Sequence, residues 1–228
     1  MNHYFPGPDE LAEALARYVA AALTNRLLCD GMAALAVSGG QTPVRFLQAL
    51  SKQPIDWHAV TVTLVDDRWV PESSTRSNAA VVRGNLLCGP AAAARFVPLV
   101  NDATTPEVGR DATEVAINAL ALPFSVVVLG MGNDGHTASF FPGGDRLIPA
   151  LAPISGRSVE TIRADAAGEP RITLTLPVLL EAEHVALHIE GQTKREVLEA
   201  AFCAGAFTDM PVRAILARYP APDIFWSP

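Results

Sequence analysis

The stretch Phe124–Ser139, which reads FSVVVLGMGNDGHTAS, determines how the rest of the chain is interpreted. Its first part, Phe124–Leu129, is an apolar run that predicts a buried strand. The run leads directly into the glycine-rich loop Gly130–Ser139, which carries Asp134 and His136. In an α/β protein, ligands bind at the loops beyond the carboxyl ends of the strands. This loop is therefore the first candidate for a functional site.

The carboxylate and the imidazole of this loop suit a proton-transfer site. An imidazole titrates near neutral pH, and a carboxylate two residues away can orient it or share the proton transfer. The alternative is an ordinary turn in which Asp134 is solvated and His136 lies on the surface. The loop alone leaves both interpretations open.

Segments typical of strands and of helices alternate along the chain. Further strands are predicted at Met32–Val37, Val60–Val65, Arg95–Val100, Val159–Arg163, Arg171–Leu176, His184–Ile189 and Val212–Leu216. Helices are predicted at Pro8–Leu28, from Thr42 onward, and at Asn78–Leu87, Thr105–Leu120, Pro177–Glu183 and Thr193–Phe202. This alternation predicts an α/β fold, a doubly wound, mainly parallel and Rossmann-like sheet with helices on both faces, in a single domain over residues 1–228.

Composition narrows the class of protein. Half of the 228 residues are hydrophobic, which argues against disorder, and the net charge of −7 argues against general nucleic-acid binding. A few local cations would still suffice for one phosphate group. No apolar run approaches the roughly 18 residues of a membrane span, and no signal-peptide pattern is visible. Three scattered cysteines fit a reducing compartment. We therefore expect a cytoplasmic protein with neither a membrane nor a nucleic acid as partner; the oligomeric state stays open.

A second glycine-rich turn follows the predicted strand Met32–Val37. The segment Val37–Pro43 reads VSGGQTP, and Thr42 is expected to cap a helix that has Pro43 at its first position. Two glycines allow the backbone to approach a ligand, and amide groups at the start of a helix attract anions. The alternative is a tight strand-to-helix turn without a ligand.

Charged residues gather after a third strand. The segment Asp66–Pro71 reads DDRWVP, and Ser77 is expected to cap the following helix. Arg68 either holds a phosphate or pairs with one of the two acids, Asp66 and Asp67.

Two more cations, Arg171 and Lys194, complete the candidate set. Lys194 is predicted in the first turn of a helix, where a cation opposes the helix dipole, so that a bound anion would relieve an unfavourable position. Both residues have the alternative of being solvated surface charges. A metal site is not expected, because His184 and His188 lie on a predicted strand and no HExxH or Cys/His cluster exists.

Together these motifs resemble the 6-phosphogluconolactonases. The resemblance rests on VSGGQTP, DDRWVP with the later Ser-Asn, GMGNDGHTASFFPG, RITLTLP and IEGQTK, which occur in the family's order from Val37 to Lys194. The family usually has Ser where this chain has Gln41, and DER where it has Asp66-Asp67-Arg68, so the contacts of Gln41 and Asp67 stay open.

The resemblance implies hydrolysis of 6-phospho-D-glucono-1,5-lactone to 6-phospho-D-gluconate without a metal or organic cofactor. It implies His136 as the general base, while Asp134 either orients His136 or contacts sugar hydroxyls. The implied substrate and phosphate ligands are Ser38, Gly39, Gly40, Gln41, Thr42, Asp66, Arg68, Gly135, Arg171 and Lys194.

The related glucosamine-6-phosphate deaminases/isomerases are the alternative. That family shares the SGG-TP and DGH elements but carries a Glu five residues after the His, paired with it for opening the sugar ring. This chain has Phe141 at that position, and an aromatic ring cannot exchange a proton. Phe141 therefore favours lactone hydrolysis.

Overall fold

The computed structural model describes residues 1–154 and 156–228. Within this part of the chain, the main sheet has seven strands, and every neighbouring pair is parallel. In spatial order they are β1 (Asn2–Tyr4), β10 (Asp223–Ser227), β9 (His184–Glu190), β6 (Val126–Leu129), β2 (Ala33–Val37), β3 (Val60–Leu64) and β5 (Arg95–Phe96). The prediction of a mainly parallel α/β sheet is confirmed.

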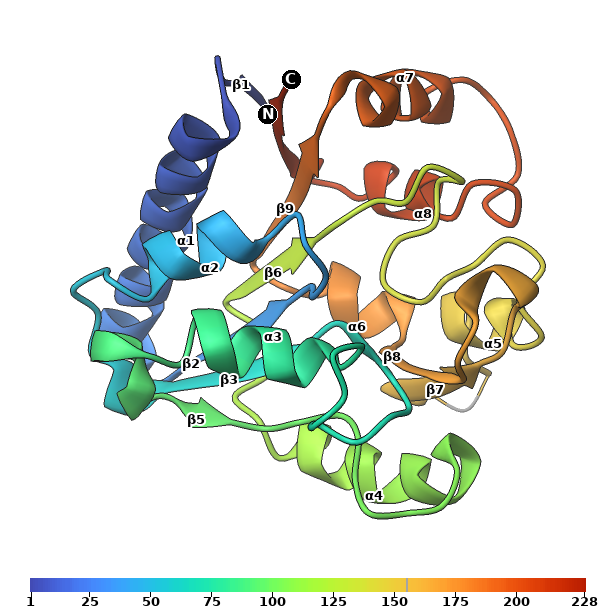
Figure 1. Cartoon of the computed structure of the whole chain (residues 1–228), viewed down its shortest axis with the longest axis horizontal. Helices are drawn as coiled ribbons and strands as arrows, with labels where there is room; N and C mark the ends of the chain where they lie inside the picture. The colour runs from blue at the N-terminus through green and yellow to red at the C-terminus, as the bar shows by residue number, and fades with distance from the viewer. Residues whose placement is uncertain (155) are drawn as a thin grey trace.

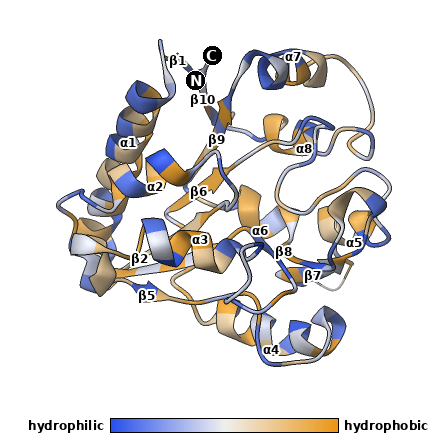
Figure 2. Cartoon of the chain, viewed as in Figure 1, coloured by the Kyte–Doolittle hydropathy of each residue, from blue (hydrophilic) through white to orange (hydrophobic). Residues whose placement is uncertain are grey.

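Helices flank this sheet on both faces (Figure 1). They are α1 (Pro8–Asp30), α2 (Val44–Leu50), α3 (Asn78–Asn85), α4 (Pro106–Asn118), α5 (Leu147–Leu151), α6 (Leu176–Leu180), α7 (Gln192–Ala201) and α8 (Val212–Leu216). The strands β2 and β6 are buried along their whole length, which their apolar sequences AALAV and VVVL allow. Figure 2 shows these central strands in hydrophobic colours, whereas the surrounding helices also carry hydrophilic stretches.

The order of the strands creates a crevice at the carboxyl ends of the central strands. The chain passes from β2 to β3 on one side and later returns to β6 on the other side of β2. The loops that leave β2 and β6 therefore diverge, and such a switch point is the usual ligand site of an open α/β sheet. Both glycine-rich loops start there, because β2 ends at Val37 and β6 ends at Leu129.

A second, smaller sheet lies beside this edge. Its antiparallel strands are β4 (Asp66–Arg68), β8 (Arg171–Leu174) and β7 (Val159–Ile162). The strands β7 and β8 were expected from the sequence, but the short strand β4 was not. Since β4 pairs Arg68 with Arg171, this sheet brings two predicted cations side by side.

The prediction of a strand at Val212–Leu216 is wrong. The segment forms helix α8, with Pro211 as its N-cap residue. The last strand is instead β10, which pairs with β1 and β9 at the edge of the main sheet. The apolar residues of VRAIL fit either period over five residues, so their spacing did not distinguish a helix from a strand.

Two local expectations also need correction. Thr42 does not cap α2: the N-cap residue is Pro43, no side chain caps the helix, and the helix begins at Val44. The strand predicted at Arg95–Val100 is limited to Arg95–Phe96. By contrast, the hydroxyl of Ser77 accepts a hydrogen bond from the amide of Ala80, as a helix cap should.

Across the described residues, no helix is both long enough and apolar enough to cross a membrane.

Candidate active site

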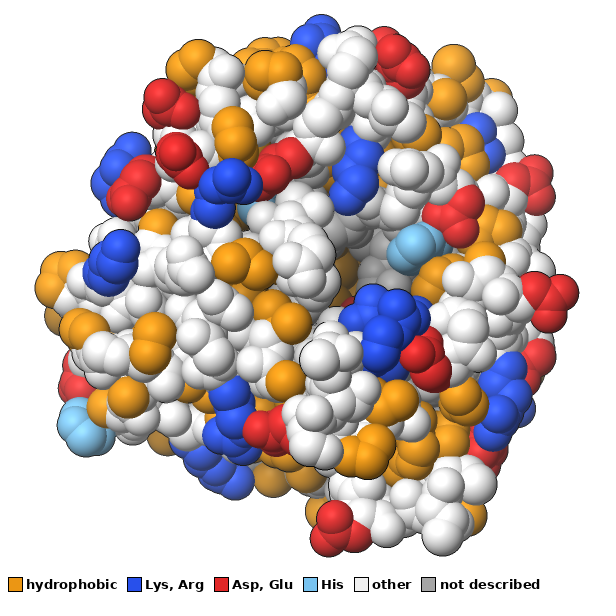
Figure 3. Space-filling view, in the orientation of Figure 1, with side chains coloured by type: hydrophobic (Ala, Val, Ile, Leu, Met, Phe, Trp, Pro, Cys, Tyr) orange, Lys and Arg blue, Asp and Glu red, His pale blue; other side chains and the backbone are white. Residues whose placement is uncertain are grey.

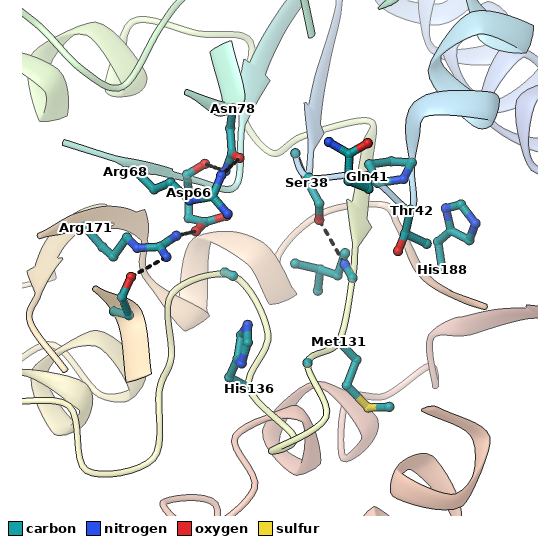
Figure 4. A pocket seen from close by; sticks show the side chains of 18 of the residues that line it. Ser38, Gln41, Thr42, Asp66, Arg68, Asn78, Met131, His136, Arg171 and His188 are labelled. Atoms are coloured by element: carbon teal, nitrogen blue, oxygen red, sulfur yellow. Dashed lines mark hydrogen bonds and ion pairs between the residues drawn. The ribbon is translucent and has the colours of Figure 1, made fainter. Parts of the chain in front are cut away.

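Ser38 joins the two glycine-rich loops at the switch point. Its hydroxyl donates to the carbonyl of Val128 at 3.0 Å and accepts from the amide of Gly130 at 2.9 Å. The end of β2 is thereby fixed to the end of β6, and Figure 4 shows this hydroxyl between the two.

A cavity of about 430 Å³ opens at this edge of the sheet. Figure 3 shows its mouth as a hollow bordered by basic side chains and a histidine. Ten of the predicted site residues line it: Ser38, Gly39, Gly40, Gln41, Thr42, Asp66, Arg68, His136, Arg171 and Lys194. Asp134 and Gly135 do not line it.

Asp134 lies behind His136 and orients its ring. The Nδ1 atom of His136 lies 2.5 Å from Oδ1 of Asp134, and the same oxygen accepts from the His136 amide at 3.1 Å. The hydrogen bond from the imidazole lowers the pKa of the Asp134 carboxyl, which is therefore ionised at neutral pH. An ionised carboxylate only accepts, so the neutral ring carries its proton on Nδ1 and the lone pair on Nε2. Figure 4 shows the imidazole directed into the cavity.

The glycines of this loop allow the His136 ring to lie close to the backbone of the loop. A Cβ atom on Gly132 would lie 2.2 Å from the His136 ring. Gly135 has a φ of +77°, and a Cβ atom there would meet the side chain of Met210. The Gly135 amide donates to the carbonyl of Gly132 at 3.1 Å. The structure thus places Gly135 in the turn that presents His136, away from the cavity.

Phe141 packs against the imidazole of His136. Its buried ring lies 4.4 Å from the His136 ring, measured between centroids, and the guanidinium carbon of Arg171 lies 5.3 Å from its centre. An apolar ring therefore contacts the imidazole at the position where the resemblance implies a carboxylate in the deaminases.

Arg171 is buried in the wall of the cavity. Its Nη2 donates to the carbonyl of Ala167 at 2.8 Å, and its Nη1 lies 3.8 Å from Oδ2 of Asp66. The same Asp66 oxygen accepts from the hydroxyl of Ser139 at 2.6 Å. Burial lowers the pKa of Arg171, so the site holds a cation that is incompletely compensated by its surroundings.

Arg68 pairs with neither neighbouring acid. Its Nη1 donates to the carbonyl of Arg76 and to Oδ1 of Asn78, both at 2.8 Å, and its buried Nε has no partner among the described residues. The structure thus contradicts the alternative of an Arg68–Asp pair.

Asp67 instead supports the start of α3. Its fully buried carboxylate accepts from the amides of Arg68, Asn78 and Ala79. Burial outweighs these donors and raises the pKa of Asp67 to about 6. This side chain therefore fixes the loop after β4 rather than lining the cavity.

Lys194 and the turn after β2 complete the site. Lys194 lies in the first turn of α7, partly buried, and burial lowers its pKa. Within residues 1–154 and 156–228 it forms no ion pair. In the same part of the chain, the amides of Gly39, Gly40, Gln41 and Thr42 donate to no protein acceptor. Four consecutive free donors and an ammonium group without an ion pair suit an anion.

Several residues that line the cavity were not predicted as part of the site. Among them are Arg76, Asn78, Met131 and His188. Asn78 contacts the turn after β2 so closely that a Cβ atom on Gly39 would lie 2.3 Å from it. The Ser-Asn pair after DDRWVP was a usable signal for Asn78, whereas nothing in the local sequence distinguished Arg76 from other surface arginines. Among the described residues, no three His, Cys, Asp or Glu side chains are grouped to hold a metal ion.

The chain is similar to known proteins over its whole length. The family model described as "Glucosamine-6-phosphate isomerases/6-phosphogluconolactonase" matches residues 6–226. A 6-phosphogluconolactonase of Rhizobium meliloti is 50% identical over 227 residues, covering 99% of this chain and 98% of that protein. One from Pseudomonas aeruginosa is 45% identical, covering 96% and 91%. The crystal structure of a 6-phosphogluconolactonase from Shewanella baltica superposes with a TM-score of 0.97 at 38% identity, covering 100% and 97%.

Proposed function

The chain belongs to the glucosamine-6-phosphate isomerase/6-phosphogluconolactonase family, and we propose that it hydrolyses 6-phospho-D-glucono-1,5-lactone to 6-phospho-D-gluconate. The observation that carries the proposal is the oriented His136–Asp134 pair at a cavity lined with cations, with Phe141 packed against the imidazole. This combination provides a base and an anion site but lacks the acid that the deaminases pair with their histidine.

The reaction needs one positioned base. Neutral His136 takes a proton on Nε2 from a water molecule as its oxygen attacks the lactone carbonyl carbon. The ester bond to the ring oxygen then breaks, and the imidazolium returns the proton to that oxygen. Asp134 stabilises the imidazolium between the two steps, since it lies 2.5 Å from Nδ1 and is ionised.

The phosphate group is bound at the cationic part of the cavity. We assign it to the free amides of the turn Gly39–Thr42 and to Arg68, Arg171 and Lys194. Each of these cations lacks a full anionic partner in the described chain, which leaves charge available for a dianion. Ser38 and Asp66 hold the walls of the site in place through their hydrogen bonds.

The experiment is a pair of assays on the purified protein. Freshly generated phosphorylated lactone should be hydrolysed well above its spontaneous rate, and glucosamine 6-phosphate should release no ammonia. Ammonia release at a catalytic rate without lactone hydrolysis would overturn the proposal and show that Phe141 does not separate the two chemistries.

We also propose that this single-domain enzyme acts in the oxidative pentose phosphate pathway of the cytoplasm and needs no metal. The three cysteines, Cys29, Cys88 and Cys203, are free and exposed, which fits a reducing compartment. A neutral imidazole can activate water without a Lewis acid. Lactonase activity should therefore survive exhaustive chelation, and its loss with EDTA and return with a divalent ion would contradict the metal-free mechanism.

A further inference from the structure

An ion pair joins two neighbouring loops that border the cavity. Arg76 lies in the loop between β4 and α3, and Glu169 lies in the loop that precedes β8. The Arg76 guanidinium donates from Nε to Oε1 of Glu169 at 2.8 Å and from Nη2 to Oε2 at 2.9 Å. Arg76 itself lines the cavity, as do Ala166 and Ala167, which precede Glu169 by three and two residues.

The pairing uses one edge of the guanidinium and leaves another free. Nε and Nη2 face Glu169, whereas Nη1 has no protein partner in the described part of the chain. The two-point contact fixes the plane of the group, and it lowers the pKa of Glu169 to about 2. The carbonyl of Arg76 also accepts from Nη1 of Arg68, so the loop is held by a residue that we assign to the phosphate.

Stability alone is a weak reason for this arrangement. The Arg76 side chain is 54% exposed, and exposed ion pairs contribute little to folding. The charges of the cavity give a stronger one. Four cationic side chains line it in the described chain, namely Arg68, Arg76, Arg171 and Lys194, against the single carboxylate of Asp66. The phosphate of the substrate carries about −1.5 to −2 charges at neutral pH.

We propose that Arg76 is a further substrate-binding residue, which presents Nη1 to the phosphate of the lactone while Glu169 holds its guanidinium in place. The proposal rests on the proposed function. It makes Arg76 a determinant of specificity for phosphorylated over neutral lactones, acting at the rim of the cavity rather than on the reacting carbonyl.

The chain provides a matched control. Arg163 and Glu107 form a second exposed arginine–glutamate pair with several hydrogen bonds, from Nε at 3.1 Å and from Nη2 at 2.9 and 3.1 Å. Arg163 is 49% exposed, close to the value for Arg76, and it does not line the cavity. Removing either arginine deletes the same charge and the same type of ion pair.

The experiment compares KM for 6-phospho-D-glucono-1,5-lactone and for unphosphorylated glucono-1,5-lactone. Arg76→Gln should raise KM for the phosphorylated lactone roughly tenfold, as expected for a partly exposed charged hydrogen bond, and shift the neutral lactone by less than about twofold. Arg76→Lys should recover part of the loss, because it keeps the charge without the planar group. Arg163→Gln should change neither KM. Thermal melting of each variant checks the fold.

Two outcomes overturn the assignment. Either KM for the phosphorylated lactone is unchanged in Arg76→Gln, or both lactones are affected equally, as a general structural defect would produce. The dissociation constant of 6-phosphogluconate, measured by calorimetry, must rise in parallel with KM. If the wild type hydrolyses neither lactone, the proposed function fails and this inference fails with it. If the wild type is active and Arg76→Gln has the same KM for the phosphorylated lactone, only the role of Arg76 is removed.

Discussion

Two histidine–carboxylate pairs lie at the carboxyl ends of adjacent strands; both histidines border the cavity, but their side chains differ in solvent exposure. His136 follows β6 and pairs through Nδ1 with Asp134, and His188 lies near the end of β9 and pairs through Nε2 with Glu190 at 3.0 Å. The His136 side chain is 30% exposed, but that of His188 is 2% exposed and its Nδ1 is buried without a partner in the described chain.

The difference shows what makes such a pair useful for proton transfer. In both pairs a carboxylate two residues away fixes the ring. Only His136 stands on a glycine-rich loop that carries it beyond the sheet, so that its second nitrogen is open to a water molecule. His188 is part of a buried strand and packs against Phe46, which suits a structural role. A His–carboxylate motif therefore indicates a base only when the other nitrogen is accessible.

The largest expected effect is the loss of the accessible ring. His136→Ala should lower kcat on the order of 10²- to 10⁴-fold, the usual contribution of a general base, while 6-phosphogluconate binding survives. Stopped assays with fresh lactone give kcat, and calorimetry gives the dissociation constant of the product. Near-normal turnover would transfer the role of base to another group.

A smaller loss should follow when the orienting carboxylate is changed. Asp134→Asn should lower kcat roughly 10- to 100-fold, because a charged hydrogen bond is removed and the amide can donate to Nδ1, which favours the wrong tautomer. The folded pKa of Asp134 is below its usual value, so the contribution of its charge is lost only as the pH falls through that low value. The deficit should therefore persist at alkaline pH, where the imidazole is neutral in both enzymes. A deficit that vanished at alkaline pH would argue against a role for the ionised Asp134 carboxylate.

The smallest effect on turnover is expected at the buried pair. His188→Gln should change kcat by less than about threefold but reduce the free energy of unfolding by about 1–3 kcal/mol, since the partly buried Glu190 loses its partner. Denaturant titration and the lactone assay measure the two quantities on the same sample. A loss of kcat as large as that of His136→Ala would erase the distinction between the two pairs.

Short-range features explain why much of the site could be predicted from the sequence. The strand before His136, the glycines around it and the nearby Asp134 lie within one stretch of 16 residues, and parallel strands bring their carboxyl ends to one edge. The alternation of strands and helices is also a short-range feature of the sequence, so the fold class could be predicted from it.

Long-range contacts explain what was missed. The role inferred for Arg76 depends on Glu169, which is 93 residues away in the sequence, and no local pattern reports that contact. The strand β4 has three residues and exists because it pairs with β8. The resemblance implied Gly135 as a substrate ligand, whereas its backbone conformation and the contact with Met210 place it in the turn behind the ring.

The most direct test of the central claim is chemical rescue of His136→Ala. Removing the imidazole leaves room beside Phe141 and Asp134, so added imidazole should bind there and accept the proton from water. The rate is measured against imidazole concentration, with the enzyme-free rate in the same buffer subtracted. The account predicts a saturable increase in lactone hydrolysis that tracks the neutral form of the added base. If no base restores hydrolysis in a folded variant that still binds 6-phosphogluconate, His136 is not the group that takes the proton.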